Sequence, residues 1–127
     1  IEVGAAMTEI ENPPADFAVQ GRDLMSGIPK EVFVSYVEIA HCLDKSISKI
    51  EEAILNALEM TPPELAADIY RTGIYMAGGG SLLRGLDKRI SLKTKLPVHV
   101  CEDPLRAVAR GTGIALKNVH KFPFLIK

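Results

Sequence analysis

The residues best suited to chemistry in this sequence are three consecutive glycines, Gly78, Gly79 and Gly80. A short apolar run precedes them and apolar residues at helical spacing follow, so the pattern predicts a strand, a tight turn and a helix. Because glycine has no Cβ atom, such a turn can adopt positive φ and bring main chain against a flat or anionic ligand. The first turn of the following helix would add unpaired N–H groups and the positive end of a helix dipole, which favour phosphate or ribose oxygens.

Spacing alone leaves a second interpretation equally open, in which the glycines only turn a corner between strand and helix. Two common phosphate-binding motifs are excluded. A G-x-G-x-x-G pattern that starts at Gly78 requires glycine where Leu83 stands. A P-loop that starts at Gly80 reaches Gly85 but then has Leu86 where lysine is required.

Composition is that of one globular domain. The chain has 127 residues, enough to bury roughly two thirds of its unfolded surface, and we expect it to have its own core. Hydrophobic residues make up 47% and charged residues 24%, which argues against disorder. The net charge of −1 gives no basic surface for nucleic acid. No apolar run approaches the roughly twenty residues that span a bilayer.

The cysteines and histidines show no ligand spacing. Cys42 and Cys101 form no C-x-x-C pair, and His41, His99 and His120 are widely separated. We interpret both cysteines as ordinary thiols of a reducing compartment rather than as reactive or metal-binding groups.

The first half of the chain predicts two strands and then helix. Alternation around Phe17 and Val19 and the apolar residues 31–35 predict an antiparallel pair. The period changes at Tyr36, which predicts a short helix to about residue 43. Asp44 can then cap a longer helix. Its apolar stripe is interpreted as core. The stripe consists of Ile47, Ile50, Ile54, Ala57 and Leu58.

The second half predicts alternating helices and strands around the glycine turn. Thr61 as N-cap and Glu64 three residues later predict a capping box that opens a short helix, which Gly73 ends in left-handed conformation. The helix after the glycines is expected to reach about Lys95, and residues 96–100 a strand. Asp103 and the proline after it predict the start of a last helix, which runs to about residue 119.

The last helix carries small residues at positions 107, 109, 111, 113 and 115. Each interior glycine costs about 1 kcal/mol relative to alanine, so something must approach this helix closely. From spacing alone we favour tight packing against the sheet over a ligand contact.

Several segments together resemble one family. These are residues 21–24, 26–30, 61–69 (TPPELAADI), 73–88 (GIYMAGGGSLLRGLDK), 96–105 (LPVHVCEDPL) and 108–113 (VARGTG). They resemble the C-terminal part of the bacterial actin-like, rod-shape-determining MreB proteins, of the actin/Hsp70 ATPase superfamily. Because the sequence starts without methionine and in the middle of an apolar pattern, we expect a fragment of a longer protein.

The resemblance implies an α/β chain that forms part of an actin-like (ribonuclease H-like) fold. Residues 1–30 would be a remnant of the outer subdomain of the second lobe, residues 31–119 its inner α/β subdomain, and residues 120–127 a C-terminal tail. The small-residue helix, residues 107–113, would be a hinge helix that faces its counterpart in the first lobe. The glycine turn would be the adenosine motif. The residues that would line the adenine, ribose and α-phosphate side of an ATP site are Gly78, Gly79, Gly80, Ser81 and Leu82.

The departures from the family concern catalysis. The family's D-x-G phosphate hairpins, its metal- and water-positioning residues and its E-x-x-K nucleotide contact are not in this sequence, so Mg²⁺ would be held elsewhere. Because phosphoryl transfer depends on such positioning groups, we expect no catalytic or metal site here and no ATP hydrolysis by this chain alone. Lys95 stands where the family usually ends a helix with glycine.

For the parent protein the resemblance implies ATP-dependent longitudinal self-assembly into filaments in the cytoplasm, at the inner face of the cell membrane. These filaments would work with the wall-synthesis machinery, with membrane contact made by segments outside this sequence. The tail, residues 121–127, would dock on the first lobe rather than in the membrane. Two alternatives remain: another ATPase of the superfamily, such as a chaperone or cell-division protein, and an interaction module that has lost nucleotide binding.

Overall fold

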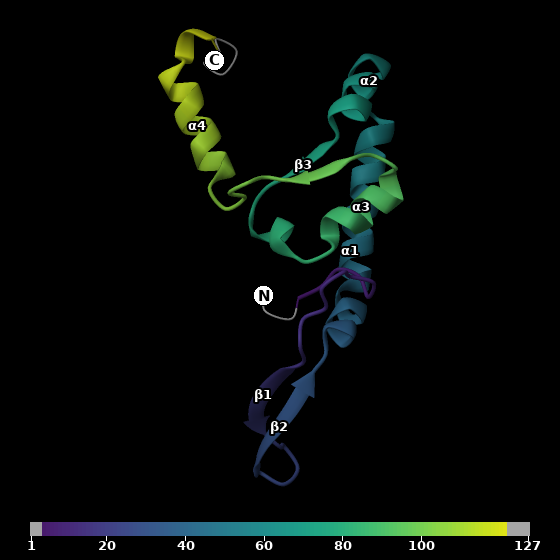
Figure 1. Ribbon diagram of the computed structural model, residues 1–127, viewed down its shortest axis with the longest axis vertical. Coiled ribbons are helices and arrows are strands. Elements are labelled where there is room, and N and C mark those ends of the chain that lie inside the picture. The colour runs from purple at the N-terminus through teal and green to yellow at the C-terminus, as the bar shows by residue number, and fades with distance from the viewer. Residues whose placement is uncertain (1–3, 122–127) are drawn as a thin grey trace.

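The computed structural model describes residues 4–121 and has an open, elongated shape (Figure 1). Its strands are β1 (Phe17–Arg22), β2 (Pro29–Val34), β3 (Ile74–Met76) and β4 (Val98–Val100). Its α-helices are α1 (Tyr36–Glu59), α2 (Pro63–Thr72), α3 (Leu86–Thr94) and α4 (Ala107–Lys117). Two short 3₁₀ helices complete it, η1 (Gly79–Leu82) and η2 (Val119–Lys121).

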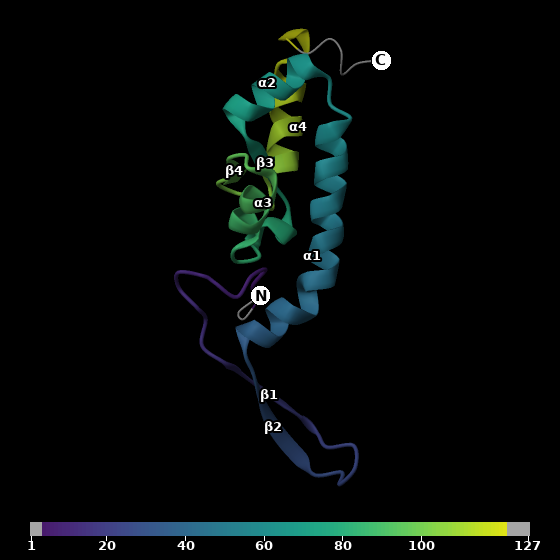
Figure 2. The same ribbon diagram turned by 90° about the vertical axis from the view of Figure 1, so that its right-hand side faces the viewer.

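The predicted strand pair is confirmed as a hairpin. β1 and β2 are antiparallel, in register from Phe17 opposite Val34 to Arg22 opposite Pro29. The hairpin projects from one end of the molecule (Figure 2). Because β2 spans residues 29–34, the expected division between residues 30 and 31 falls inside this strand.

Helix α1 is one continuous element, so the prediction of a short helix followed by one capped at Asp44 is wrong. The start signal lies at Ser35, whose hydroxyl accepts from the Glu38 N–H at 3.2 Å while the Glu38 carboxylate accepts from the Ser35 N–H at 2.9 Å. Nothing between residues 36 and 59 breaks the helix, so Asp44 lies in its interior. Of the predicted stripe, Ile47 is buried, whereas Ile50 is 48% exposed.

The boundaries of α2 also differ from the prediction. The helix begins at Pro63 with Pro62 as N-cap and without a side-chain cap. The Thr61 hydroxyl instead donates to the Ala57 carbonyl at 2.8 Å, so the predicted capping box does not form. Gly73 does take positive φ (+79°), although its ψ of −170° is extended rather than left-handed helical. A Cβ there would lie 2.4 Å from the Pro97 carbonyl oxygen, so only glycine fits.

The core lies between α1, α3 and one face of a two-stranded sheet. β3 and β4 pair in parallel, with Ile74 opposite Val98. Ala6, Ile47, Leu86 and Ile90 form the buried cluster. Among the described residues no large side chain is less than 2% exposed. The expected core is therefore present, but it is small.

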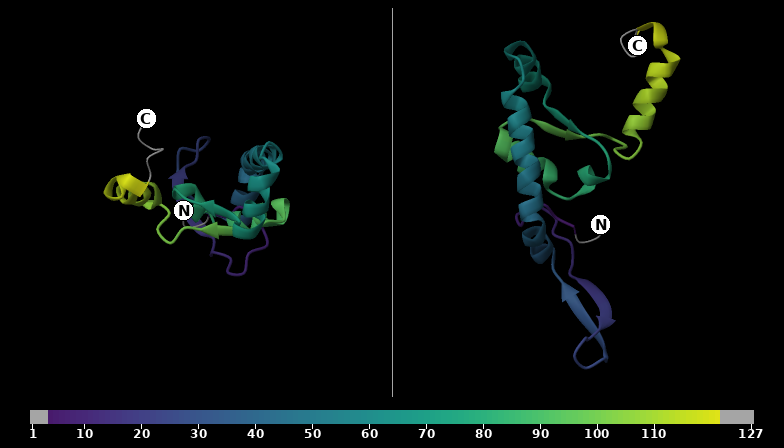
Figure 3. Two further views of the ribbon diagram at one scale, coloured as in Figure 1. Left: turned by 90° about the horizontal axis from the view of Figure 1, so that it is seen from above. Right: turned by 180° about the vertical axis from the view of Figure 1, so that it is seen from behind.

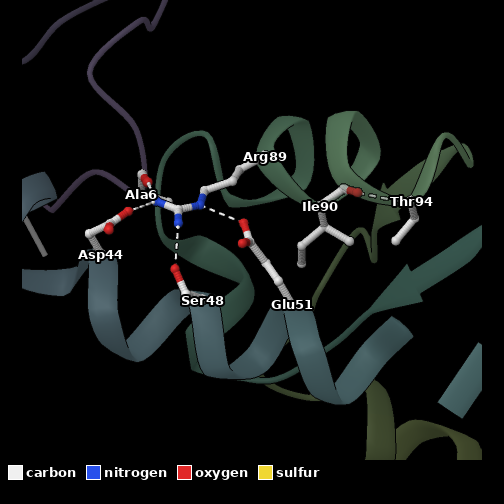
Figure 4. A network of polar contacts seen from close by, with 7 residues as sticks. All are labelled: Ala6, Asp44, Ser48, Glu51, Arg89, Ile90 and Thr94. Carbon is white, nitrogen blue, oxygen red and sulfur yellow. Dashed lines mark hydrogen bonds and ion pairs between the residues drawn. The ribbon is translucent and has the colours of Figure 1, made fainter. Parts of the chain in front are cut away.

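A guanidinium group ties three segments together beside this cluster (Figure 4). Arg89 on α3 donates from Nε to the Glu51 carboxylate of α1 at 2.6 Å and from Nη1 to the Ala6 carbonyl at 2.9 Å. Nη1 also lies 2.8 Å from the Asp44 carboxylate, and Nη2 lies 3.3 Å from the Ser48 hydroxyl. The bond to Glu51 is the main cause of the raised pKa of Arg89. The network fastens α3 and the N-terminal segment to α1.

Helix α4 stands apart from the sheet, and Figure 3 shows it and α1 on opposite sides of the strands. It begins at Ala107 with Arg106 as N-cap and without a side-chain cap, so the predicted N-cap at Asp103 is three residues early. No residue of α4 is buried. A Cβ at Gly111 or Gly113 would meet nothing within 4 Å outside the helix's own backbone. The prediction that the glycines allow this helix to pack tightly against the sheet is therefore wrong. The predicted tail falls mostly at residues 122–127, outside the described residues.

Candidate nucleotide-binding turn

The glycine turn follows β3 at the carboxyl edge of the parallel pair. Gly78 has φ +83° and ψ 173°, a conformation that residues other than glycine rarely adopt. Its N–H donates to the Pro104 carbonyl at 2.7 Å, and the Cys101 N–H donates to the Met76 carbonyl at 3.0 Å. The turn is thus fixed to the loop that follows β4. In α/β sheets this edge is the usual place for a ligand.

The residues after Gly78 form the single 3₁₀ turn η1. The Ser81 N–H and hydroxyl both donate to the Gly78 carbonyl, at 3.2 and 2.7 Å. Ser81 is 7% exposed, so its hydroxyl braces the turn from inside, whereas Leu82 is 47% exposed. The N–H groups of Gly79 and Gly80 lie in the first turn, where a helix offers no acceptor of its own.

The prediction that a helix follows the glycines directly is wrong. Leu83 is extended (φ −68°, ψ 120°), Arg84 forms a parallel bridge with Ala5, and Gly85 has φ +77°. Only then does α3 begin, because these two backbone conformations interrupt the helical path. The N–H groups at the glycines therefore belong to η1, and the dipole of α3 starts six residues beyond Gly80. Helix α3 ends at Thr94, and Lys95 takes the left-handed cap position (φ +61°) that suits glycine.

The three glycines differ in whether the folded chain requires glycine at their positions. Gly78 needs positive φ, whereas Gly79 and Gly80 do not. A Cβ at Gly80 would meet nothing within 4 Å, and one at Gly79 would touch only Leu105 Cδ2, at 3.5 Å. The chain itself therefore leaves the turn open and gives no reason for glycine at positions 79 and 80. An open turn of this kind is what the close approach of a flat ligand to the main chain requires.

Sequence reasoning missed the loop that borders the turn. Pro104 bonds to Gly78 and Leu105 lies beside Gly79, yet this segment was assigned to a helix start. The available signal was the pairing of two parallel strands, because loops after neighbouring parallel strands emerge at the same edge.

Other sites are scarce in the described residues. Across residues 4–121, no group of three His, Cys, Asp or Glu side chains could hold a metal ion, and no helix is long and apolar enough to cross a membrane. Two open cavities of about 340 and 370 Å³ lie between α3 and the N-terminal segment and share Lys88. Neither is lined by the glycine turn.

Solved structures show what fold this arrangement is part of. MreB5 of Spiroplasma citri bound to ADP superposes with a TM-score of 0.84 and 36% identity, over 99% of this chain and 37% of that one. The same protein bound to AMPPNP gives a TM-score of 0.82 and 39% identity, over 94% and 35%. The chain is therefore part of an actin-like α/β fold, as the sequence predicted.

The family follows from sequence. The model of the MreB/Mbl protein family matches residues 1–123. The cell shape-determining protein Mbl of Bacillus subtilis is 43% identical over 85% of this chain, and MreB of Escherichia coli 42% over 93%. This chain belongs to the MreB/Mbl family. It spans about a third of the length of these relatives (32% and 33%). The chaperone and cell-division alternatives are accordingly set aside.

Proposed function

We propose that the full-length protein containing this chain binds ATP, and that Gly78, Gly79, Gly80, Ser81 and Leu82 form one wall of the site. The observation that carries the proposal is the openness of the turn, because Gly79 and Gly80 are required by neither backbone conformation nor neighbouring atoms. The structures of Spiroplasma citri MreB5 bound to ADP and to AMPPNP support it.

Each residue has a separate role in this proposal. Gly78 supplies the bend and Ser81 braces it through the Gly78 carbonyl. Gly79 and Gly80 admit the nucleotide and offer N–H groups to ribose or phosphate oxygens. Leu82 offers an exposed apolar side chain at the far end of η1. The groups that would hold Mg²⁺ and the terminal phosphates lie in parts of the protein outside this chain.

Membership of the MreB/Mbl family supports the wider part of the proposal. The protein assembles longitudinally into filaments at the inner face of the cell membrane and acts with the wall-synthesis machinery to set rod shape. Within it, the N-terminal part of this chain belongs to the outer subdomain of the second lobe and the part that carries the glycine turn to its inner subdomain.

Sedimentation of the full-length protein with and without ATP tests this function. We expect ATP-dependent pelleting that Gly79→Val abolishes, together with loss of binding to a fluorescent ATP analogue. A Cβ at position 79 would meet only Leu105 Cδ2, at the ordinary contact distance of 3.5 Å. Gly21→Val is the matched control, because a Cβ at Gly21 would meet nothing within 4 Å and Gly21 lies in the hairpin.

The two ways to fail are distinct. A wild-type protein with no ATP-dependent change in sedimentation would favour an interaction module that has lost nucleotide binding. A Gly79→Val variant that still binds the analogue and pellets normally would remove the glycine turn from the site.

A further inference from the structure

Ala6, in the segment that precedes the hairpin, is buried and has both of its main-chain polar groups bonded. Its exposed fraction is 0%, and so is that of Ala5. The Ala6 N–H donates to the Arg84 carbonyl at 2.8 Å, beside the parallel bridge between Ala5 and Arg84. The Ala6 carbonyl accepts from Nη1 of Arg89 at 2.9 Å. The main chain at Ala6 is therefore held between Arg84 and the guanidinium group of Arg89.

Arg84 in turn determines where the glycine turn ends. It lies two residues beyond the last residue of η1. Between them, the Leu83 N–H donates to the Gly80 carbonyl at 3.1 Å. Planar peptide units and this bond leave the chain little freedom between Gly80 and Arg84, so a shift of Arg84 would move the end of the turn. The start of the turn is anchored separately, by the loop after β4.

Arg89 can hold the segment in place because it is itself fixed to α1. Its Nε donates to the Glu51 carboxylate at 2.6 Å, and its guanidinium lies between α1 and Ala6 (Figure 4). The hydroxyl of Tyr36 also donates to this segment, at the Thr8 carbonyl, but that bond is exposed and 3.3 Å long. Bonds made by a charged donor are the stronger kind. Arg89 therefore provides the firmer link between α1 and the N-terminal segment.

We propose that Arg89 is a positioning residue for the nucleotide site. It acts through the main chain, because it holds Ala6, which holds Arg84 and with it the end of the glycine turn. This inference rests on the proposed function, in which the turn is a wall of the ATP site. Without Arg89 the end of the turn is free to move, and nucleotide binding must then order it at a cost in affinity. Linkage makes the effect reciprocal, so bound nucleotide should steady the bond between Ala6 and Arg84.

Two variants of the full-length protein isolate this role. In Arg89→Met combined with Glu51→Gln, the Ala6 carbonyl loses its donor and no buried carboxylate is left without a partner. Glu51→Gln alone is the matched control, because it keeps Arg89 and the bond to Ala6. We expect the double variant to bind a fluorescent ATP analogue about fivefold or more weakly than Glu51→Gln does.

Ile90→Val controls for a general loss of stability. Ile90 is 2% exposed and lies next to Arg89 on α3, so its substitution removes a buried methyl group and leaves the bond to Ala6 in place. Its affinity for the analogue should equal that of the wild type.

Hydrogen exchange of the Ala6 amide provides a readout that a purely structural role would not change. Saturating AMPPNP should slow this exchange about fivefold or more in the wild type and in Glu51→Gln. In the double variant, AMPPNP should leave the exchange unchanged. The wild-type measurement tests the coupling even if the double variant does not fold.

Three outcomes would overturn the inference. The first is equal affinity of the double variant and Glu51→Gln for the analogue. The second is a loss of affinity in Ile90→Val as large as that in the double variant. The third is an Ala6 amide that AMPPNP does not protect in the wild type. The proposed function fails in a different way, through a wild type that does not bind the analogue or a Gly79→Val variant that binds it normally, and the inference then falls with it.

Discussion

Two ion pairs in this protein allow a test of whether burial or distance determines how much an ion pair contributes to stability. Arg89 and Glu51 meet at 2.6 Å with side chains that are 18% and 9% exposed. Lys88 and Glu11 also meet at 2.6 Å, but their side chains are 48% and 82% exposed. If ion-pair distance set the energy, breaking either pair would cost the same.

We expect very different costs. Removal of one partner from a buried pair costs about 3–5 kcal/mol because a buried charge is left uncompensated. Arg89 keeps Asp44, Ser48 and the Ala6 carbonyl and some solvent, so Glu51→Ala should cost about 2–3 kcal/mol. Lys88→Ala removes an exposed pair, which contributes little because solvent screens the two charges.

Native-state hydrogen exchange of α1 and α3 amides in the full-length protein measures the cost of both substitutions. The exchange of α3 amides that open together should quicken about 30- to 150-fold in Glu51→Ala and less than about fivefold in Lys88→Ala. Arg89→Lys should resemble Glu51→Ala, because the lysine ammonium lacks the fork of donors with which the guanidinium contacts both α1 and the N-terminal segment. Equal effects of Glu51→Ala and Lys88→Ala would refute the argument from burial.

Three further outcomes are expected. The backbone N–H and the hydroxyl of Ser35 lower the pKa of Glu38, so the ionised carboxylate stabilises the start of α1 above the ordinary glutamate pKa of 4.5, and this contribution is lost as the pH falls through the lowered pKa. In Glu38→Gln, hydrogen exchange of the α1 amides should therefore depend less on pH at acid pH. This chain alone should release no phosphate above background from ATP, which a phosphate-release assay checks. Gly78→Ala should lower the free energy of unfolding by about 1–3 kcal/mol, because alanine is strained at positive φ. Gly80→Ala should change the free energy of unfolding by less than about 1 kcal/mol but weaken ATP binding.

The hairpin and the strands β3 and β4 were predictable because their signals are local. Alternating side chains define β1 and β2, and short apolar runs after glycine or before a loop define β3 and β4. Helix starts were less predictable, since several residues compete for the N-cap. Ser35 and Asp44 both fit a cap, and Glu38, which closes a capping box with Ser35, decides for Ser35.

The core could not be predicted from the chain alone, because burial depends on everything that packs against it. Length and composition predict a self-sufficient core, yet α4 remains uncovered. The interval between η1 and α3 was missed for a related reason. Leu83 and Leu86 fit one apolar helical stripe, but the bridge from Arg84 to Ala5 comes from residues 79 positions away in sequence and holds the chain extended between them.

The glycine turn shows why a motif can be recognised before it can be explained. In sequence, Gly78, Gly79 and Gly80 are equivalent. In the folded chain only Gly78 has a conformational need, which Pro104 secures through its carbonyl. The other two lack any intramolecular reason, and glycine at such positions costs about 1 kcal/mol relative to alanine in a helix. In the proposed site a ligand that reaches the main chain accounts for this cost. At Gly73 no ligand is needed, because a Cβ there would lie 2.4 Å from the Pro97 carbonyl oxygen.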